Sequence, residues 1–321
     1  MKRPVRLALL FIALILGLQA AHAAYPERQV RIVLPYAAGG GGDVLTRLIG
    51  ASLSDLWRQP VITDNRPGAG ATIGTDMVAK APADGYTLLM TASTMAISPV
   101  AYPQLPYDVL KDFAPITLVA QSPYILATNP KLQVQSVAEL LALARKEPGK
   151  LNYGSPGKGT VSHLTFELLR HRTGMEAAVV AYKGSNPALV AALAGEIDFV
   201  IDTPAAVMQH VNAKKLRALA VMSAKRAQSA PEIPSMTEAG VKDVDVVVWF
   251  GLLAPAGTPA EIVRKIQADA ATVLSSPDVA SRLRQNGLEV VTSQPEEFAG
   301  YLRSEVDKWT DVVKKAGIKF D

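Results

Sequence analysis

The chain has 321 residues, no cysteine and a formal net charge of +4 at neutral pH. Without cysteine the fold cannot depend on disulfides or thiolate metal sites, and this length is enough for two lobes, each with its own core. Three of the 33 basic residues, Lys2, Arg3 and Arg6, lie at the N-terminus, so the rest of the chain carries 30 basic against 29 acidic residues. No basic block remains there, and we expect no nucleic-acid partner and no lipid-headgroup surface.

The first 24 residues have the pattern of an export signal. The basic N-terminus precedes an apolar run at residues 7–18 that is too short to span a bilayer comfortably, and Ala21-His22-Ala23 is a small-residue cleavage site. We expect cleavage near Ala23 or Ala24 and a periplasmic mature protein. A membrane anchor is the weaker interpretation because the apolar run ends early.

Short apolar runs alternate with amphipathic stretches along the rest of the chain, which indicates an α/β fold with mainly parallel sheets. Strands are expected at residues 30–34, 61–63, 87–90, 116–120, 124–128, 179–182, 198–202, 216–221 and 246–253. Helices are expected from Asp43, around residues 73–78, from the capping box Ser136 to Glu139, from Ser162 and up to Gly195. Three C-terminal helices are expected to begin at Thr258-Pro259, Ser276-Pro277 and Ser293-Gln294-Pro295.

Two long apolar segments are interpreted as crossings between lobes. The strands at 116–120 and 124–128 are separated only by Gln121, Ser122 and Pro123, and residues 246–253 provide the return. This division predicts a first domain of residues 25–122 and 247–321 and a second domain of residues 123–246.

A glycine-rich turn follows the first expected strand. Residues 35–42 contain a proline and four consecutive glycines, which exclude regular structure, and Asp43 is a suitable N-cap for the helix that follows. Bare backbone N–H groups and the positive end of the helix dipole converge in front of such a turn. The turn can therefore bind an anion without a charged side chain.

Residues 151–163 repeat this plan of strand, glycine-rich turn and helix start. We expect the two turns to face each other across a cleft between the lobes and to hold a small carboxylate. Further hydrogen-bond donors are the hydroxyl residues Ser93, Thr94, Ser155, Thr160, Ser162 and Ser185. This set binds anions but contains no reactive group, which favours a receptor that closes over its ligand by a hinge motion.

Several enzyme motifs are matched only in part. Residues 68–74 have the glycine spacing of a dinucleotide turn, but a tight turn is the simpler interpretation, and neither glycine turn contains the Gly-Lys-Ser/Thr of a P-loop. Ser155 and Lys158 match Ser-x-x-Lys, but Pro156 and Gly157 prevent the helical turn that would bring the two side chains together. The histidines after the signal form no close pair, so we expect no metal and no cofactor.

Three residues keep two interpretations each. His163 is either a packed or capping histidine or a carboxylate contact, and Asp43 is favoured as a helix cap over a ligand contact. Asp202, at a strand end, either caps the next helix or receives a ligand ammonium. In the alternative of a secreted hydrolase or isomerase acting on a small acid, His163 and Asp202 are the candidates for its base or nucleophile.

Nine segments in order along the chain carry a family resemblance. They include Asn65-Arg66-Pro67-Gly68-Ala69-Gly70 and lie at residues 33–43, 65–70, 83–88, 105–108, 111–115, 151–153, 182–185, 216–220 and 249–255. Each segment is weak alone. Together, from Tyr25 to the end, they resemble the Bug-type (TctC-like) solute-binding receptors of tripartite tricarboxylate transport systems.

The resemblance implies a two-lobed, type II-like periplasmic-binding-protein fold and a monomer. Its implied ligand is a small carboxylate such as an amino acid, a di- or tricarboxylate or an aromatic acid. The implied partners are the membrane components of a tripartite tricarboxylate transporter or a sensor kinase. Together with the donors above, it implies ligand contacts at Tyr36, Ala37, Ala38, Gly39, Gly40, Gly41, Asp43, Ser93, Thr94, Ser155, Gly159, Thr160, Ser162, His163, Tyr182, Gly184, Ser185 and Asp202.

The sequence also departs from the family pattern. Ala38 stands where the family usually has proline, and Gly42 where it has a hydroxyl residue. Pro156 and Lys158 replace small polar residues. Lys158 either adds a positive charge to the cleft, which favours a more acidic ligand, or points into solvent.

Overall fold

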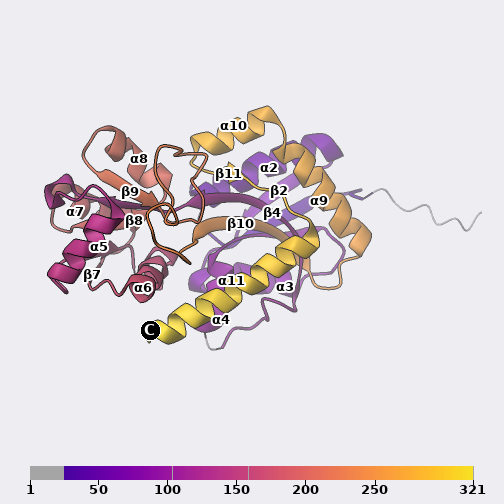
Figure 1. Cartoon of the computed structure of the whole chain (residues 1–321). Helices are drawn as coiled ribbons and strands as arrows, with labels where there is room; N and C mark the ends of the chain where they lie inside the picture. The colour runs from indigo at the N-terminus through magenta and orange to yellow at the C-terminus, as the bar shows by residue number, and fades with distance from the viewer. Residues whose placement is uncertain (1–24, 103, 158, 321) are drawn as a thin grey trace, which may run out of the picture.

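The computed structural model describes residues 25–102, 104–157 and 159–320. The expected export signal and Lys158 lie outside the described residues. Two β-sheets, each covered by helices, form two lobes that lie side by side (Figure 1). Lobe 1 is built on a six-stranded sheet and lobe 2 on a five-stranded sheet, and both ends of the described chain belong to elements that pack on lobe 1.

The sheet of lobe 1 has the strand order β11-β4-β10-β3-β1-β2. Its strands are β1 (Val30–Leu34), β2 (Val61–Asn65), β3 (Thr87–Ala92), β4 (Phe113–Pro123), β10 (Val247–Pro255) and β11 (Glu289–Val290). Its helices are α2 (Gly41–Trp57), α3 (Thr72–Ala79), α4 (Thr94–Ala101), α9 (Ala260–Leu274), α10 (Pro277–Gln285) and α11 (Pro295–Ala316), besides the short 3-10 turn η1 (Ala69–Ala71).

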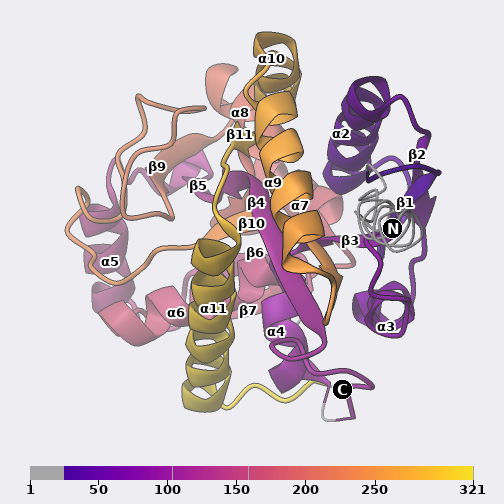
Figure 2. The same ribbon diagram turned by 90° about the vertical axis from the view of Figure 1, so that its right-hand side faces the viewer.

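Side-chain alternation along β1 divides the core of lobe 1 into two layers. Ile32 and Leu34 belong to the apolar cluster that includes residues of α2, α9 and α10, whereas Val33 belongs to the cluster that includes residues of α3, α4 and α11. In Figure 2, α9 and α10 form one column and α11 another, with β4 between them. The sheet is therefore covered by helices on both faces, as expected of an α/β fold.

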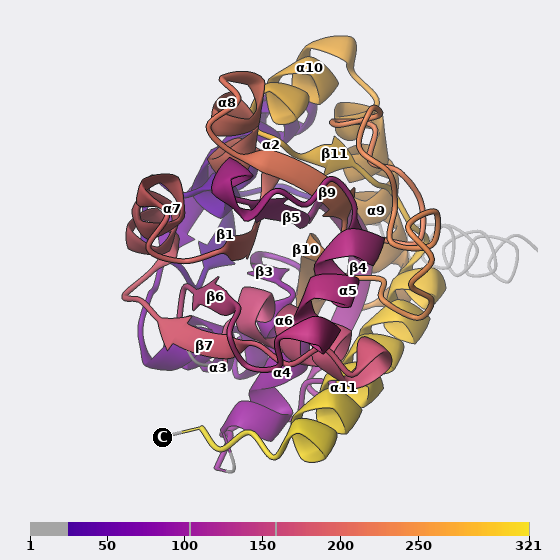
Figure 3. The same ribbon diagram turned by 60° about the vertical axis from the view of Figure 1, so that its left-hand side comes forward.

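The sheet of lobe 2 has the order β7-β6-β8-β5-β9. Its strands are β5 (Ile125–Thr128), β6 (Asn152–Ser155), β7 (Ala178–Ala181), β8 (Phe199–Asp202) and β9 (Arg217–Val221). Its helices are α5 (Val137–Lys146), α6 (Val161–Thr173), α7 (Ser185–Ala194) and α8 (Pro204–Asn212), and the 3-10 turn η2 (Pro130–Leu132) follows β5. Figure 3 shows α7 and α8 on one side of this sheet and α5 and α6 on the other.

The expectation of mainly parallel sheets is correct only for part of each lobe. β1 pairs in parallel with β2 and β3, and β6 pairs in parallel with β7 and β8. β10 is antiparallel to both β3 and β4, and β5 is antiparallel to β8 and β9. The sheets are mixed because the chain crosses between the lobes twice: β4 and β5 are separated only by Tyr124, and β10 returns alongside β4 over its whole length.

Two helix starts differ from those expected. α2 begins at Gly41 with Gly40 as its N-cap, so Asp43 lies in the first turn and not at the cap. α9 begins at Ala260, and the Thr258 hydroxyl donates to the Pro255 carbonyl oxygen at 2.8 Å and makes no capping box. In both places a short polar side chain forms a hydrogen bond with the backbone of the preceding turn. This bond competes with the N-cap hydrogen bond that the sequence position suggests.

Candidate ligand site between two glycine turns

The first glycine turn joins β1 to α2 and exposes its backbone amides. Among the described residues, no hydrogen bond is recorded for the N–H groups of Ala37, Ala38 and Gly40, nor for those of Gly41 and Gly42 at the start of α2. These donors lie in front of the positive end of the helix dipole. The turn can thus offer several N–H groups to one anion.

Asp43 holds this turn in shape. Its carboxylate accepts the Gly39 N–H at 3.0 Å, Arg47 Nε at 3.0 Å and Asn65 Nδ2 at 3.0 Å, and the residue is only 6% exposed. The hydrogen bond from Arg47, then that from Gly39, lowers the pKa of Asp43 to about 2. Its oxygens are therefore occupied within the protein, which favours the structural interpretation of this residue.

Tyr36 links the turn to the start of α4. Its hydroxyl lies 2.5 Å from Thr94 Oγ1 and accepts the Ala92 N–H at 3.3 Å. Burial raises the pKa of Tyr36, so the phenol stays protonated at neutral pH. Ser93, the N-cap of α4, is buried, and its N–H donates to the Trp249 carbonyl oxygen at 3.0 Å.

The second glycine turn joins β6 to α6. Thr160 is the N-cap: its hydroxyl donates to the Gly157 carbonyl oxygen at 2.8 Å and accepts the His163 N–H at 3.3 Å. Among the described residues, no acceptor is recorded for the N–H groups of Val161 and Ser162. This helix N-terminus is a second anion-binding position of the same kind as the first.

His163 braces the second turn from inside. Its Nδ1 accepts the Gly159 N–H at 2.9 Å, and its Nε2 lies 3.8 Å from Glu167 Oε1. The hydroxyl of Ser162 donates to the Ile201 carbonyl oxygen at 2.5 Å, and Ser155 Oγ donates to the Gly157 carbonyl oxygen at 3.2 Å. The sequence suggests ligand contact for Ser155 and Ser162 and leaves His163 open between packing and ligand contact. The structure gives each of the three side chains a partner within the protein.

The remaining expected contacts gather at the carboxyl ends of β7 and β8. The Ser185 hydroxyl donates to Asp202, whose other oxygen accepts the Thr203 N–H at 2.7 Å. Burial raises the pKa of Asp202, while the bond from Ser185 opposes that rise. Tyr182 and Gly184 donate their N–H groups to the carbonyl oxygens of Ser155 and Pro156, which ties this cluster to the second turn.

The two turns line one cavity of about 440 Å³, a size usual for small-molecule sites. Of the expected contacts, it brings together Tyr36, Ala37, Thr94, Gly159 and Thr160. The other thirteen expected contacts do not line it. Its other lining residues, which sequence reasoning did not single out as contacts, are Pro35, Pro67, Gly68, Gly70, Ala71, Ile97, Ser98, Ala101, Tyr102 and Phe320.

Comparison with known proteins now decides the family. Residues 45–318 match the model of the tripartite tricarboxylate transporter family receptor, TctC. The chain belongs to this family. The chain is therefore a solute-binding receptor, and its two α/β lobes agree with those of a similar periplasmic transporter of known structure. The family implies a periplasmic location.

Relatives match over nearly the whole length of this TctC-family receptor. It is 36% identical to the protein BugT of Bordetella pertussis, over 92% of this chain and 91% of that protein. Two structures from Rhodopseudomonas palustris are similar: Rpa4515 with adipate (37% identity, TM-score 0.77, covering 92% and 99% of the two chains) and MatC with bound malate (31%, 0.73, 90% and 100%).

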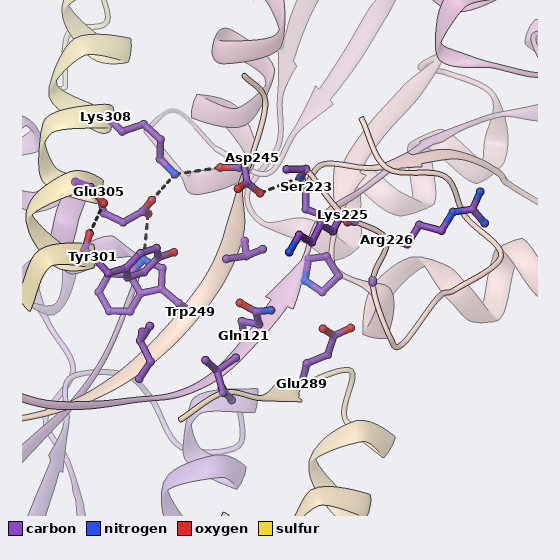
Figure 4. Close-up of a pocket in the computed structure, with 18 residues that line it drawn as sticks. Gln121, Ser223, Lys225, Arg226, Asp245, Trp249, Glu289, Tyr301, Glu305 and Lys308 are labelled. Atoms are coloured by element: carbon purple, nitrogen blue, oxygen red, sulfur yellow. Dashed lines mark hydrogen bonds and ion pairs between the residues drawn. The ribbon is translucent and has the colours of Figure 1, made fainter. Parts of the chain in front are cut away.

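A second cavity of the receptor, of about 580 Å³, lies between β4, β10, β11, α11 and the loop after β9 (Figure 4). Glu305 accepts the indole N–H groups of Trp249 at 3.1 Å and Trp309 at 3.2 Å and pairs with Lys308. Lys308 also donates to the Asp245 carbonyl oxygen at 3.1 Å. Three acidic residues (Asp245, Glu289 and Glu305) and three basic residues (Lys225, Arg226 and Lys308) line this cavity, so their formal charges balance, and neither glycine turn contributes to its lining.

The described part of the receptor contains neither a candidate metal-binding cluster nor a candidate membrane-spanning helix. Within residues 25–102, 104–157 and 159–320, no group of His, Cys, Asp or Glu side chains could hold a metal ion. No helix in those ranges combines the length and apolar character needed to cross a bilayer.

Proposed function

We propose that this receptor captures a small carboxylate between its two glycine turns and delivers it to the membrane components of a tripartite tricarboxylate transporter or to a sensor kinase. The supporting observation is that Ala37 of the first turn and Gly159 of the second line the same cavity. These turns come from different lobes, so a ligand that contacts both is enclosed when the lobes close.

Backbone groups do most of the binding in this proposal. One ligand carboxylate accepts N–H groups at the N-terminus of α6, where Thr160 caps the helix. The other end of the ligand reaches the amides of the first turn, directly or through ordered water. Several donors and two helix dipoles together offset the desolvation of a carboxylate that meets no counter-charge.

The thirteen expected contacts outside the cavity divide into three roles. We assign Ala38, Gly39, Gly40 and Gly41 to the anion-binding backbone of the first turn. Tyr182, Gly184, Ser185 and Asp202 would contact a longer ligand after closure, and Asp202 would then receive an ammonium or a hydroxyl group. The buried or internally bonded Asp43, Ser93, Ser155, Ser162 and His163 would shape the two turns.

The lobes would divide at the crossing strands, with residues 25–122 and 247–321 in the first domain and residues 123–246 in the second. The short connection at Tyr124 between β4 and β5, and the segment before β10, are then the hinge. Residues 1–24 would serve as the export signal, and the protein would act as a periplasmic monomer.

Solute binding fits the residues better than catalysis. The two candidates for a base or nucleophile, His163 and Asp202, already bond to Gly159 and Ser185 respectively. Two similar solved structures support this: the periplasmic binding protein BugD (33% identity, TM-score 0.73) and a periplasmic transporter (39% identity, TM-score 0.76). A secreted hydrolase or isomerase therefore remains only the competing outcome of the test that follows.

A thermal-shift screen of the purified protein tests the proposal. The panel would contain acetate, succinate, malate, adipate, citrate, aspartate and benzoate. A ligand at 100 times its dissociation constant stabilises a protein by about 2.7 kcal/mol, so a specific acid should give a clear shift. Recovery of that acid unchanged by NMR after incubation supports a receptor. Conversion of the acid, or no shift with any member of the panel, argues against the proposal.

A further inference from the structure

The C-terminal tail reaches from lobe 1 to the second glycine turn. α11 packs on β4 and α4 of lobe 1 and ends at Ala316, with Gly317 as its left-handed C-cap. The chain then runs on to Phe320, which lines the cavity between the turns. The tail therefore ends at the second turn, where Phe320 meets Gly159 just before α6 begins.

The Phe320 ring rests directly on Gly159. A Cβ atom added to Gly159 would lie 2.4 Å from Cε1 and 2.7 Å from Cδ1 of that ring, which is closer than any side chain allows. Gly159 also has a φ of +77°, a conformation that favours glycine. The close approach of an aromatic ring to a backbone amide turn therefore depends on glycine at this position.

The walls of this cavity are mostly apolar. Among its described lining residues none is charged, and its side-chain hydroxyls come only from Tyr36, Thr94, Ser98, Tyr102 and Thr160. The remaining surface is backbone or hydrocarbon, contributed by α4, by the turn at residues 67–71 and by Phe320. A second or third carboxylate in the middle of a ligand would be buried here without a counter-charge, which is costly.

We propose that the site selects carboxylates with an apolar body, either an alkyl chain or an aromatic ring, and that Phe320 is the residue that sets this preference. The inference rests on the proposed function, since it assumes that the carboxylate binds at the glycine turns. The hydrocarbon body lies against Phe320, Ile97 and Ala101, where its transfer out of water adds affinity.

Isothermal titration with two homologous series tests this preference. The first series is acetate, butanoate and hexanoate, and the second is succinate and adipate, with benzoate and citrate as single additions. Burial of each methylene group is worth about 0.8 kcal/mol, so each should tighten binding about fourfold. Adipate should bind about sixteenfold more tightly than succinate, and citrate should bind more weakly than both.

Three variants assign the effect to the ring. Phe320→Ala should weaken hexanoate and benzoate at least tenfold while changing the affinity for acetate less than twofold. Phe320→Leu, which keeps an apolar wall, should restore most of the affinity for hexanoate. Lys319→Ala removes an exposed neighbour in the same tail and should leave every affinity unchanged.

The outcomes separate this inference from the proposed function. Binding of acetate and succinate with no gain on chain extension, or hexanoate affinity that Phe320→Ala leaves intact, overturns the preference alone. Absence of binding by any carboxylate to the folded wild-type protein overturns both. Tighter binding of citrate than of adipate also overturns the preference, because it requires a charged group that the described lining lacks.

Discussion

The indole N–H of Trp249 donates to Glu305 Oε2 at 3.1 Å, which ties the returning strand β10 to helix α11. The same carboxylate accepts Trp309 Nε1 and pairs with Lys308, and the residue is only 3% exposed. A single buried carboxylate thus satisfies two buried indole donors and one cation. This network lines the second cavity, where β10 and α11 face each other (Figure 4).

Glu305→Ala should destabilise the protein by about 3 kcal/mol. The substitution leaves two indole N–H groups and the Lys308 ammonium without their acceptor, and a buried unsatisfied polar group is expensive. Urea unfolding measures the change. Asp307→Ala, at an exposed position of the same helix, should change the free energy of unfolding by less than about 0.5 kcal/mol. Equal effects for the two variants would contradict this view of Glu305.

Gly40→Val should abolish most ligand binding while the protein still folds. A Cβ atom at Gly40 meets no atom within 4 Å, so the side chain has space, but it stands beside the amides that would hold the ligand. Gly300→Val, on an exposed face of α11 with equally open surroundings, is the matched control. Calorimetric titration should find at least a tenfold loss of affinity for Gly40→Val alone; wild-type affinity would remove the first turn from the site.

Asp43 should make the stability of the protein sensitive to acid. Its folded-state pKa of about 2 lies below the ordinary value of 3.8, so its contribution is present above pH 4 and is lost as pH falls towards 2. The expected contribution is about 2 kcal/mol. Unfolding free energies of the wild type and Asp43→Asn, measured between pH 2 and pH 7, should converge at the acid end. A difference that stays constant with pH would refute this.

Asp202 should show the opposite dependence. Burial raises its pKa, so the folded protein binds a proton more tightly than the unfolded chain does. The stability of the wild type relative to Asp202→Asn should therefore fall as pH rises above the ordinary value of 3.8. Glu196→Gln, an exposed acid in the same lobe, controls for the change in net charge. A wild type that gains stability over Asp202→Asn with rising pH would show that the hydrogen bond from Ser185 outweighs burial.

Periodicity in the sequence predicts most of the fold because the strands and amphipathic helices are local patterns. β1 coincides with the expected residues 30–34, and the expected cap at residues 293–296 corresponds to a capping box between Gln294 and Glu297. The expected residues 246–253 mark β10. α4 (Thr94–Ala101), a short helix that contains Pro99, is not among the helices expected from the sequence, where Thr94 is considered only as a hydrogen-bond donor.

The site is less predictable, because its decisive contacts join distant parts of the chain. Both glycine turns are visible in the sequence, but the partner of Ser162 is the carbonyl oxygen of Ile201, which no local pattern indicates. The glycines at residues 68 and 70 indicate a tight turn in the sequence, but they do not indicate that this turn lines the cavity. No sequence pattern indicates that Phe320 lines the cavity, since its position depends on the course of α11 across the molecule.

One apolar cluster includes residues of both lobes, such as Val33 and Leu89 from the first sheet and Leu126 and Phe199 from the second. Because buried side chains of the two sheets belong to one contiguous core, neither lobe can lose its packing without exposing apolar surface of the other. Heat should therefore melt the protein in a single cooperative transition, with equal calorimetric and van't Hoff enthalpies. The unit that unfolds is then the whole molecule, larger than either of the lobes that we propose to close on the ligand.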